Sequence, residues 1–342
     1  MIDLYPRVLV TGGAGFIGSH LAEELLAAGH EVAVLDDLST GSLRNIQPLI
    51  GRPGFQFHLG SVLEAAVCDT LVSRADLVIH LAAAVGVKLI FERPAETIER
   101  NVMGTSRILD ACLRHCRKVF VASTSEVYGK EPRVGGARFR EDDDITLGAS
   151  MRWAYAASKA IDEYLARAYA QSKGLPAVVG RLFNTVGPRQ SSAYGMVLPR
   201  FVSWALEGKP IQVYGDGSQT RAFCHVRDVT RAVRLLIAEP RAEGEIFNIG
   251  SSETVTILEL AQRVKEATLS ASEIRLIPYE QAYGPGFDDI KNRVPDLGKI
   301  HALVGYEPRY SLDAILRDVI EFVSTLLSRS TKLESAAAVS PQ

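Results

Sequence analysis

The sequence predicts an α/β fold, with a doubly wound parallel sheet and a smaller mixed α/β lobe that binds substrate. Two observations lead to this prediction. Short runs rich in β-branched residues alternate with amphipathic helical stretches through the first half of the chain, and the first run ends in a glycine-rich turn. Apolar strands separated by helices imply a parallel sheet that is covered on both faces. At 342 residues the chain can bury a large core without disulfides.

The individual elements follow from the period of the apolar residues. Strands are predicted where Val, Ile and Leu cluster in short runs, and helices where apolar residues recur every three or four positions. The predicted strands are residues 7–11, 31–36, 55–59, 77–82, 119–123 and 177–182. The predicted helices of this part are residues 20–28, 95–115 and 154–171.

The first predicted strand runs into the turn TGGAGFIGSHL, in which Gly12, Gly15 and Gly18 precede a helix. Glycines there allow a tight turn and a close approach of a pyrophosphate, which the helix N-terminus attracts. The second strand ends in Leu-Asp-Asp, so Asp36 lies eighteen residues beyond Gly18. Its carboxylate can accept hydrogen bonds from the adenosine ribose and would repel a 2′-phosphate. The sequence therefore predicts a Rossmann domain that binds NAD rather than NADP.

Tyr155 and Lys159 are candidates for proton transfer. They stand four residues apart in AYAASKAIDEYLARAY, so both side chains lie on one face of a helix. A lysine charge about 6 Å from the phenol, at an effective dielectric near 20, is worth roughly 3 kcal/mol, or about two pKa units off the tyrosine. This predicts a tyrosine base near neutral pH. The run STSEVYG, which supplies Thr124, Ser125 and Glu126, ends an earlier strand.

After Asn184 the pattern changes to the loop-rich stretch GPRQSSAYG. Helices are predicted near residues 198–207 and 227–238, and strands near 211–214 and 246–249. We assign these to a smaller lobe over the carboxyl ends of the strands, where open α/β sheets bind ligands. The predicted division is 1–184 for a mainly NAD-binding domain, 185–327 for a mainly substrate-binding lobe, with crossings between them, and 328–342 for a disordered tail.

Charge and cysteine content argue against several classes of protein. The chain has 38 basic and 40 acidic residues and no Lys/Arg run, which argues against a nucleic-acid partner. It lacks a signal peptide pattern and any run of about eighteen apolar residues, which argues against secretion and a membrane span. Cys112, His115 and Cys116 fit a helical apolar pattern, so no metal site is predicted. The scattered cysteines fit a reducing compartment, and the predicted location is cytoplasmic.

Several motifs together resemble the extended short-chain dehydrogenase/reductase family, whose members modify nucleotide sugars. The resemblance spans about residues 7–325 and implies that NAD takes hydride from sugar C4 and later returns it. It implies that Thr124 and Tyr155 hold the hydroxyl that loses its proton, and that Lys159 holds the nicotinamide ribose. The motifs that carry it are TGGAGFIGSHL, HLAAAVGV, NVMGT, STSEVYG, YAASK, RLFNTVGPR and YGDGSQTRAFCHVRDV.

The same resemblance implies the ligand contacts. One departure is Gly60-Ser61-Val62, where many members of the family carry an Asp that contacts the adenine. The implied cofactor-binding residues are Gly12, Gly15, Phe16, Ile17, Gly18, Asp36, Leu81, Ala82, Ala83, Asn101, Tyr155 and Lys159. The implied substrate-binding residues are Ser125, Asn184, Arg221 and Arg293, with both arginines near the nucleotide diphosphate.

The residues of the stretch STSEVYG differ between enzymes that carry out different reactions on a sugar oxidised to a ketone at C4. Simple 4-epimerases resemble SSATVYG, without an acid, and 4,6-dehydratases resemble TDEVYG, with an Asp–Glu pair. This chain keeps Glu126 but has Ser125 where a dehydratase has its Asp. In this it resembles UDP-glucuronate decarboxylases, including UDP-xylose synthases and the decarboxylase of lipid A aminoarabinose modification. A uronic acid oxidised at C4 is a β-keto acid, which loses carbon dioxide with the ketone as electron sink.

Several alternatives remain open at this point. Glu126 could position the C6 carboxylate, strain it by charge proximity, or handle the proton returned to C5. It could instead be a partly solvated acid bonded to a neighbouring backbone group or arginine. The alternative activities are a UDP-sugar 4-epimerase, a 4,6-dehydratase and a non-catalytic NAD-bound regulator. The helix NVMGTSRILDACLRH and the Tyr155 helix resemble the pair that forms a four-helix dimer interface in the family, which implies a homodimer.

Overall fold

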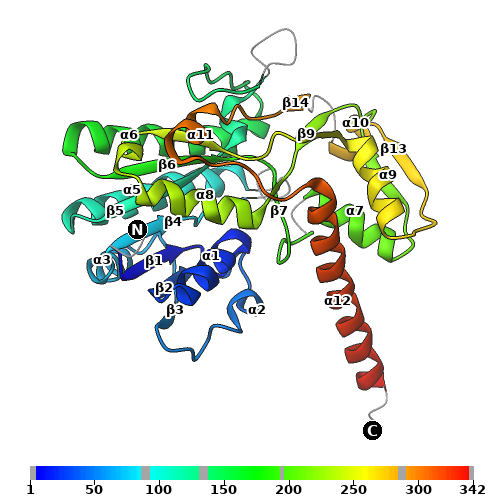
Figure 1. Cartoon of the computed structure of the whole chain (residues 1–342), viewed down its shortest axis with the longest axis horizontal. Coiled ribbons are helices and arrows are strands. Elements are labelled where there is room, and N and C mark those ends of the chain that lie inside the picture. The colour runs from blue at the N-terminus through cyan, green and yellow to red at the C-terminus, as the bar shows by residue number, and fades with distance from the viewer. Residues whose placement is uncertain (1–4, 86–92, 131–137, 193–195, 284–289, 339–342) are drawn as a thin grey trace.

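A seven-stranded sheet forms the centre of the larger lobe (Figure 1). The structure, a computed structural model, describes residues 5–85, 93–130, 138–192, 196–283 and 290–338. The strands of the sheet are β1 (Arg7–Thr11), β2 (Glu31–Asp36), β3 (Phe55–Leu59), β4 (Leu77–His80), β5 (Lys118–Thr124), β6 (Ala177–Leu182) and β11 (Ile246–Ile249). They pair in parallel in the order β11-β6-β5-β4-β1-β2-β3, which confirms the predicted fold class.

Helices cover both faces of this sheet. On one face they are α1 (Phe16–Ala27) and α8 (Val226–Ala238), and on the other α3 (Ala65–Arg74), α5 (Pro94–Arg114) and α6 (Ala154–Lys173). Successive residues of β1 point to opposite faces, so Val8 and Val10 pack in the core with α1 and α8, and Leu9 packs in the core with α3 and α5. Because both faces are covered, the strand is apolar throughout rather than alternating.

Two elements that the sequence analysis placed in the smaller lobe belong to the larger one. Strand β11 pairs with β6 at the edge of the central sheet, and α8 packs beside α1. All four residues of β11 are buried, and Val229 and Val233 of α8 share a core with Val10. The chain therefore crosses back to the central sheet after entering the smaller lobe, since a fully buried apolar strand needs neighbours on both faces.

The smaller lobe is built from short strands and four helices packed around its own core, which includes Phe201, Leu260 and Ile315. Its helices are α7 (Val197–Leu206), α9 (Ile257–Ala267), α10 (Tyr279–Tyr283) and α12 (Leu312–Ala338). Its strands are β8 (Ile211–Tyr214) with β13 (Ile274–Ile277), and β9 (Thr220–Ala222) with β12 (Thr254–Thr256) and β14 (Asn292–Arg293). The remaining elements are α2 (Leu43–Ile46), α11 (Gly298–Val304), β7 (Thr185–Val186) and β10 (Cys224–His225), and the 3-10 turns Ser125–Tyr128, Met151–Trp153 and Pro240–Ala242.

Helix α12 projects beyond the smaller lobe in Figure 1 and continues to Ala338. The sequence pattern predicted a disordered tail from residue 328, because the segment SRSTKLESAAA lacks an apolar face. The structure differs there, and the segment is rich in good helix formers such as Ala, Leu, Lys and Glu, which extend a helix without needing a core partner. Within the described residues no helix has the length and apolar character of a membrane span.

Asn248 of β11 connects the central sheet to the loops around the cavity. Its side chain accepts a hydrogen bond from the Tyr128 hydroxyl at 2.7 Å and donates to the carbonyls of Phe139 and Asp296 at 2.9 and 3.3 Å. Its backbone N–H donates to the Glu141 carboxylate at 2.7 Å. Asn248 is fully buried, so its own polar atoms are satisfied by these partners in place of water.

We predict that Asn248→Ala lowers the free energy of unfolding by about 2–3 kcal/mol, because it removes the acceptor of the buried Tyr128 hydroxyl and one donor from each of the carbonyls of Phe139 and Asp296. Urea denaturation followed by circular dichroism measures this loss. Gln171→Ala, at an exposed position of α6, is the matched control and should stay within about 0.5 kcal/mol of the wild type. An Asn248→Ala loss no larger than the control would contradict the role given to Asn248.

Candidate active site

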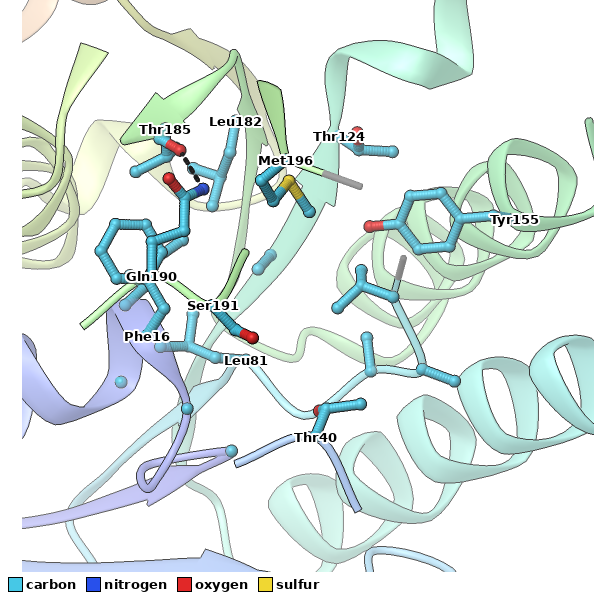
Figure 2. A pocket seen from close by; sticks show the side chains of 18 of the residues that line it. Phe16, Thr40, Leu81, Thr124, Tyr155, Leu182, Thr185, Gln190, Ser191 and Met196 are labelled. Carbon is cyan, nitrogen blue, oxygen red and sulfur yellow. Dashed lines mark hydrogen bonds between the residues drawn. The ribbon is translucent and has the colours of Figure 1, made fainter. Parts of the chain in front are cut away.

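A cavity of about 780 Å³ opens at the carboxyl ends of the central strands and reaches into the smaller lobe. Every residue that the sequence analysis assigned to catalysis or substrate lines this cavity, and so does every assigned cofactor residue except Asn101. Figure 2 shows the Tyr155 hydroxyl pointing into the cavity near Thr124, with Phe16, Leu81 and Gln190 on the opposite side. The tertiary structure thus brings together residues from position 12 to position 293 of the chain.

The glycine-rich turn forms one wall of the cavity. Gly12 has a left-handed backbone with φ of 70°, and a Cβ there would lie 2.7 Å from the backbone nitrogen of Ala82. A Cβ on Gly18 would lie 2.3 Å from the carbonyl oxygen of Gly12. Gly15 caps α1 without a side-chain hydrogen bond, so the first N–H groups of this helix face the cavity with no side chain in the way. This arrangement fits a pyrophosphate.

Asp36 lies at the end of β2, where the cavity passes the glycine-rich turn. Its carboxylate accepts hydrogen bonds from the backbone N–H groups of Ala14 at 2.9 Å and Leu38 at 2.8 Å. Burial raises the pKa of Asp36, and these backbone donors lower it in part. A carboxylate that is held in this way and still lines the cavity fits the role predicted for a ribose acceptor.

Asn101 lies behind the cavity wall rather than on it. Its amide oxygen accepts from the backbone N–H of Ala84 at 2.7 Å, and its amide nitrogen donates to the Ser158 hydroxyl at 3.0 Å. Asn101 is buried and connects α5 to α6 through these bonds. The structure therefore places Asn101 as a support for the loop after β4, whereas the sequence analysis listed it among the cofactor contacts.

Tyr155 has a raised pKa, which differs from the lowered value that the sequence analysis expected. Burial is the largest cause, followed by the negative charge of Glu126 and, less strongly, that of Asp162, while a hydrogen bond with Thr124 opposes them. The ammonium group of Lys159 is instead paired with Asp162, at 2.6 Å. The expected lysine effect on the phenol is therefore offset by an acid that the sequence analysis did not consider.

Glu126 lies between two arginines at the substrate end of the cavity. Its Oε2 is 3.1 Å from Nη1 of Arg152, and its Oε1 is 3.5 Å from Nη1 of Arg293. The side chains of Glu126 and Arg152 are 17% and 10% exposed, so Glu126 is half-buried and paired with arginine. This geometry fits the alternative of a partly solvated acid bonded to an arginine as well as a catalytic role. Both guanidinium groups also line the cavity, where a guanidinium can bind a ligand carboxylate through two parallel hydrogen bonds.

Arg293 and Arg221 are neighbours across the β14–β9 pair, in which they stand in register. Arg221 is buried, and its Nη1 donates to the backbone carbonyls of Thr220 at 2.9 Å and Lys291 at 3.1 Å. Asn184, at the end of β6, donates from its side chain to a backbone carbonyl of β9 and has a φ of 28°. The smaller lobe thus supplies two adjacent guanidinium groups to the cavity, which fits the predicted diphosphate contact.

Two further serines on the cavity wall, Ser125 and Ser61, lie in short turns of the chain. Ser125 is buried at the first position of the turn Ser125–Tyr128. Ser61 lines the cavity where many members of the family have an Asp, and its Oγ accepts from the backbone N–H of Leu63 at 3.2 Å. Ser61 is thus engaged in its own turn.

Sequence reasoning missed Arg152 and Asp162. Each stands three residues from a predicted catalytic side chain, Arg152 before Tyr155 and Asp162 after Lys159, so the helical period was a signal that could have identified both. Gln190 was also missed, and it donates to the backbone carbonyl of Thr185 at 2.9 Å on the opposite wall (Figure 2). No local pattern distinguishes Gln190, because it comes from a loop.

Comparison with known proteins gives consistent results. A family model described as the NAD dependent epimerase/dehydratase family matches residues 8–250. The chain is 42% identical, over 319 residues, to a UDP-N-acetyl-alpha-D-glucosaminuronate decarboxylase of Bacillus cytotoxicus, a match that covers 92% of this chain and 97% of the relative. It is 35% identical to UDP-glucuronic acid decarboxylase 1 of Danio rerio, over 93% of this chain and 72% of that protein.

Among solved structures, the UDP-glucuronic acid 4-epimerase of Bacillus cereus, in complex with UDP-glucuronic acid and NAD, superposes with a TM-score of 0.84. The two chains are 30% identical, and the match covers 94% of this chain and 99% of that one. These findings confirm the family that the motifs predicted. Its similar members include decarboxylases, 4-epimerases and, at 31% identity, a dTDP-glucose 4,6-dehydratase of Streptomyces venezuelae.

We predict that the protein binds NAD roughly tenfold or more tightly than NADP. Asp36→Asn should reduce the ratio of the two dissociation constants, because the variant no longer places a negative charge against a 2′-phosphate. Titration calorimetry with each dinucleotide measures the ratio. Asp76→Asn removes an acid that pairs with Arg7 at the opposite end of β1 and serves as control. An unchanged ratio of NAD to NADP affinity in Asp36→Asn would show that Asp36 does not discriminate between a ribose 2′-hydroxyl and a 2′-phosphate.

Proposed function

We propose that this chain, which belongs to the NAD-dependent epimerase/dehydratase family and uses NAD as its cofactor, is a decarboxylase of UDP-linked uronic acids. UDP-glucuronate is the expected substrate, and the N-acetylated uronic acid named for the Bacillus cytotoxicus relative is the second substrate to test. The observation that carries the proposal is the half-buried Glu126 between Arg152 and Arg293.

The proton transfer is assigned to Tyr155. Its hydroxyl points into the cavity beside Thr124, so the two can hold the C4 hydroxyl, and Tyr155 takes the proton (Figure 2). When bound, NAD supplies the hydride acceptor for C4. Lys159, one helical turn from Tyr155, provides the positive charge that favours the ionised phenol once its pairing with Asp162 is weakened.

Loss of carbon dioxide then needs little from the protein. With a ketone at C4, the C6 carboxylate is β to a carbonyl, and the bond between C5 and the carboxyl carbon breaks with its electrons passing to the ketone oxygen. The guanidinium groups of Arg152 and Arg293 line the cavity beside Glu126 and can bind the carboxylate of a uronic acid, which a neutral hexose lacks. Glu126 and its arginines are then placed to orient that carboxylate and to return a proton to C5 through water.

The other chemistries need different residues. A 4,6-dehydratase requires an acid for the C6 oxygen, and Ser125 stands where that acid would be. A 4-epimerase of UDP-glucuronate remains the second candidate, because such an enzyme of Bacillus cereus shares this fold at 30% identity. A non-catalytic role fits poorly, since Thr124, Tyr155 and Lys159 all line the cavity.

The deciding assay supplies NAD and four substrates separately: UDP-glucuronate, UDP-N-acetylglucosaminuronate, UDP-glucose and UDP-galactose. Carbon dioxide release and the product sugars are both measured. Decarboxylation of either uronic acid supports the proposal. Conversion of UDP-glucuronate to UDP-galacturonate without carbon dioxide would assign the chain to the epimerases instead.

We predict that Glu126→Gln lowers the rate of carbon dioxide release by about a hundredfold, because the variant loses the charge that balances the two arginines and the group proposed to handle the C5 proton. Single-turnover release of labelled carbon dioxide measures it. Glu99→Gln, an exposed acid on α5, is the matched control and should behave as wild type. Unchanged release in Glu126→Gln would remove Glu126 from the chemistry.

We also propose that the protein is a homodimer through α5 and α6. Exposed apolar side chains gather on these two helices, where Met103, Ile161 and Tyr164 are 47%, 43% and 63% exposed. Such a patch is typical of a surface covered by a partner.

The cytoplasm is the proposed location, since all four cysteines are free, as a reducing compartment favours.

We predict that the wild type has the mass of a dimer in light scattering, and that Tyr164→Glu shifts it to a monomer, because a charge would be buried in the interface. Leu269→Glu is the control, since Leu269 is 94% exposed and lies away from α5 and α6. A Tyr164→Glu protein that stays dimeric would place the interface elsewhere.

A further inference from the structure

Lys159 is held by a buried acid that the reaction described above does not use. Its ammonium nitrogen lies 2.6 Å from Oδ2 of Asp162, and the two side chains are 3% and 0% exposed. The second oxygen of Asp162, Oδ1, has no hydrogen-bond partner within the described part of the chain. The negative charge of this buried carboxylate is therefore compensated mainly by Lys159.

The position of Asp162 follows from helix geometry. Side chains on a helix lean toward its N-terminus, so an acid one turn after Lys159 leans back over it. Tyr155 lies one turn before Lys159 on the same face of α6. Lys159 thus stands between a phenol that it could activate and a carboxylate that neutralises it.

A chain of buried polar side chains supports Asp162 from behind. The Thr105 hydroxyl of α5 lowers the pKa of Asp162, whereas burial, the larger effect, raises it. Thr105 Oγ1 is 3.1 Å from Nε2 of His80, and Nδ1 of His80 is 2.8 Å from the Thr11 hydroxyl. The backbone N–H of Ala82 donates to that hydroxyl at 3.3 Å.

These contacts have one consistent direction of donation. Burial lowers the pKa of His80 to about 3, so its ring is neutral near pH 7 and carries one proton. Thr11, which accepts from the backbone, can donate to Nδ1, and Nε2–H can donate to Thr105, whose own proton then faces Asp162. The chain thus supplies a hydroxyl donor to Asp162, which, together with Lys159, opposes the effect of burial on the pKa of Asp162.

The surrounding charges leave Asp162 as the group that offsets Lys159. Glu163 is neutralised by Arg181, with contacts of 2.9 and 2.8 Å, and by the Ser123 hydroxyl. Glu126 is paired with its two arginines. The titratable and charged groups around Tyr155 and Asp162 are Lys159 and Glu163 on α6, His80 on β4, Arg181 on β6, Glu126 in the turn Ser125–Tyr128, and Arg152 in the turn Met151–Trp153.

We propose that Asp162 is a positioning residue that holds Lys159 away from Tyr155 and so keeps the phenol protonated until ligands occupy the cavity. The proposal rests on the proposed function, in which Tyr155 is the base. Asp162 acts on the reaction only through Lys159 and through its own charge. The ribose hydroxyls of the cofactor compete with Asp162 for the ammonium group, so activation of Tyr155 is coupled to binding.

The test measures the ionisation of Tyr155 directly, first in the protein freed of NAD and then after NAD is added. The protein is labelled with ¹³C at Cζ of tyrosine, and its NMR signals are followed between about pH 8 and pH 12. Tyr155→Phe identifies the signal. In Asp162→Asn the Tyr155 midpoint should fall by about one unit, because a negative charge is lost and Lys159 is released. No substrate is needed, so this result does not depend on which sugar the enzyme uses.

The same variant has a kinetic signature. Tyr155 works as a base, so a lower pKa moves the acidic limb of the kcat/KM profile for UDP-glucuronate to lower pH. This shift should equal the one that NMR shows with NAD bound, and a full unit corresponds to about tenfold more activity below that limb. Asp162→Glu restores the charge and should return both midpoints toward wild type. Asp110→Asn removes an acid that binds the Tyr169 hydroxyl on the same pair of helices, and it should leave both midpoints unchanged.

An unchanged Tyr155 midpoint in folded Asp162→Asn would overturn the proposal. If that variant does not fold, Asp162→Ser carries the same test, since its hydroxyl can accept from Lys159 without a charge. A shifted NMR midpoint in a protein that releases no carbon dioxide would uphold the role of Asp162 and reject the decarboxylase instead.

Discussion

The cavity depends on one constraint, which is that the parallel strands of the central sheet all end at the same edge. Strand β1 delivers the glycine-rich turn to that edge, β2 delivers Asp36, and β5 delivers Thr124 and Glu126. These residues are far apart in the sequence, yet parallel pairing leaves them side by side. The remaining parts of the site are then fixed by what packs against this edge.

Charge compensation is the second organising principle of the site. Glu126 is paired with two arginines, and Lys159 is paired with Asp162, so without ligands the molecule satisfies its own buried charges. Under the proposed function, a substrate carboxylate or the cofactor ribose would take the place of one of these internal partners. That exchange would lower the raised pKa of Tyr155 and allow it to act as the proposed base.

The smaller lobe contributes what the sheet edge lacks. Its β9–β14 pair places Arg221 and Arg293 next to one another, and Arg293 also reaches Glu126. The proposed diphosphate contact and the proposed carboxylate contact are therefore built on one short sheet. The return of the chain to β11 ties that lobe to the central sheet through Asn248, so the two sides of the cavity are held in a common framework.

Local patterns in the sequence determined the strands of the first half, the helices α1, α5 and α6, the glycine-rich turn, Asp36 and the Tyr155–Lys159 pair, because each depends on spacing within one element. They did not identify the helices α2 and α3. Tertiary structure alone decided that β11 and α8 join the larger lobe and that Asn101 lies behind the wall. It also decided that Glu126 meets Arg293 and that Asp162 neutralises Lys159. The pKa of Tyr155 is an example. Burial and the charge of Glu126, from another element, raise it by more than Lys159, four residues away on the same helix, lowers it.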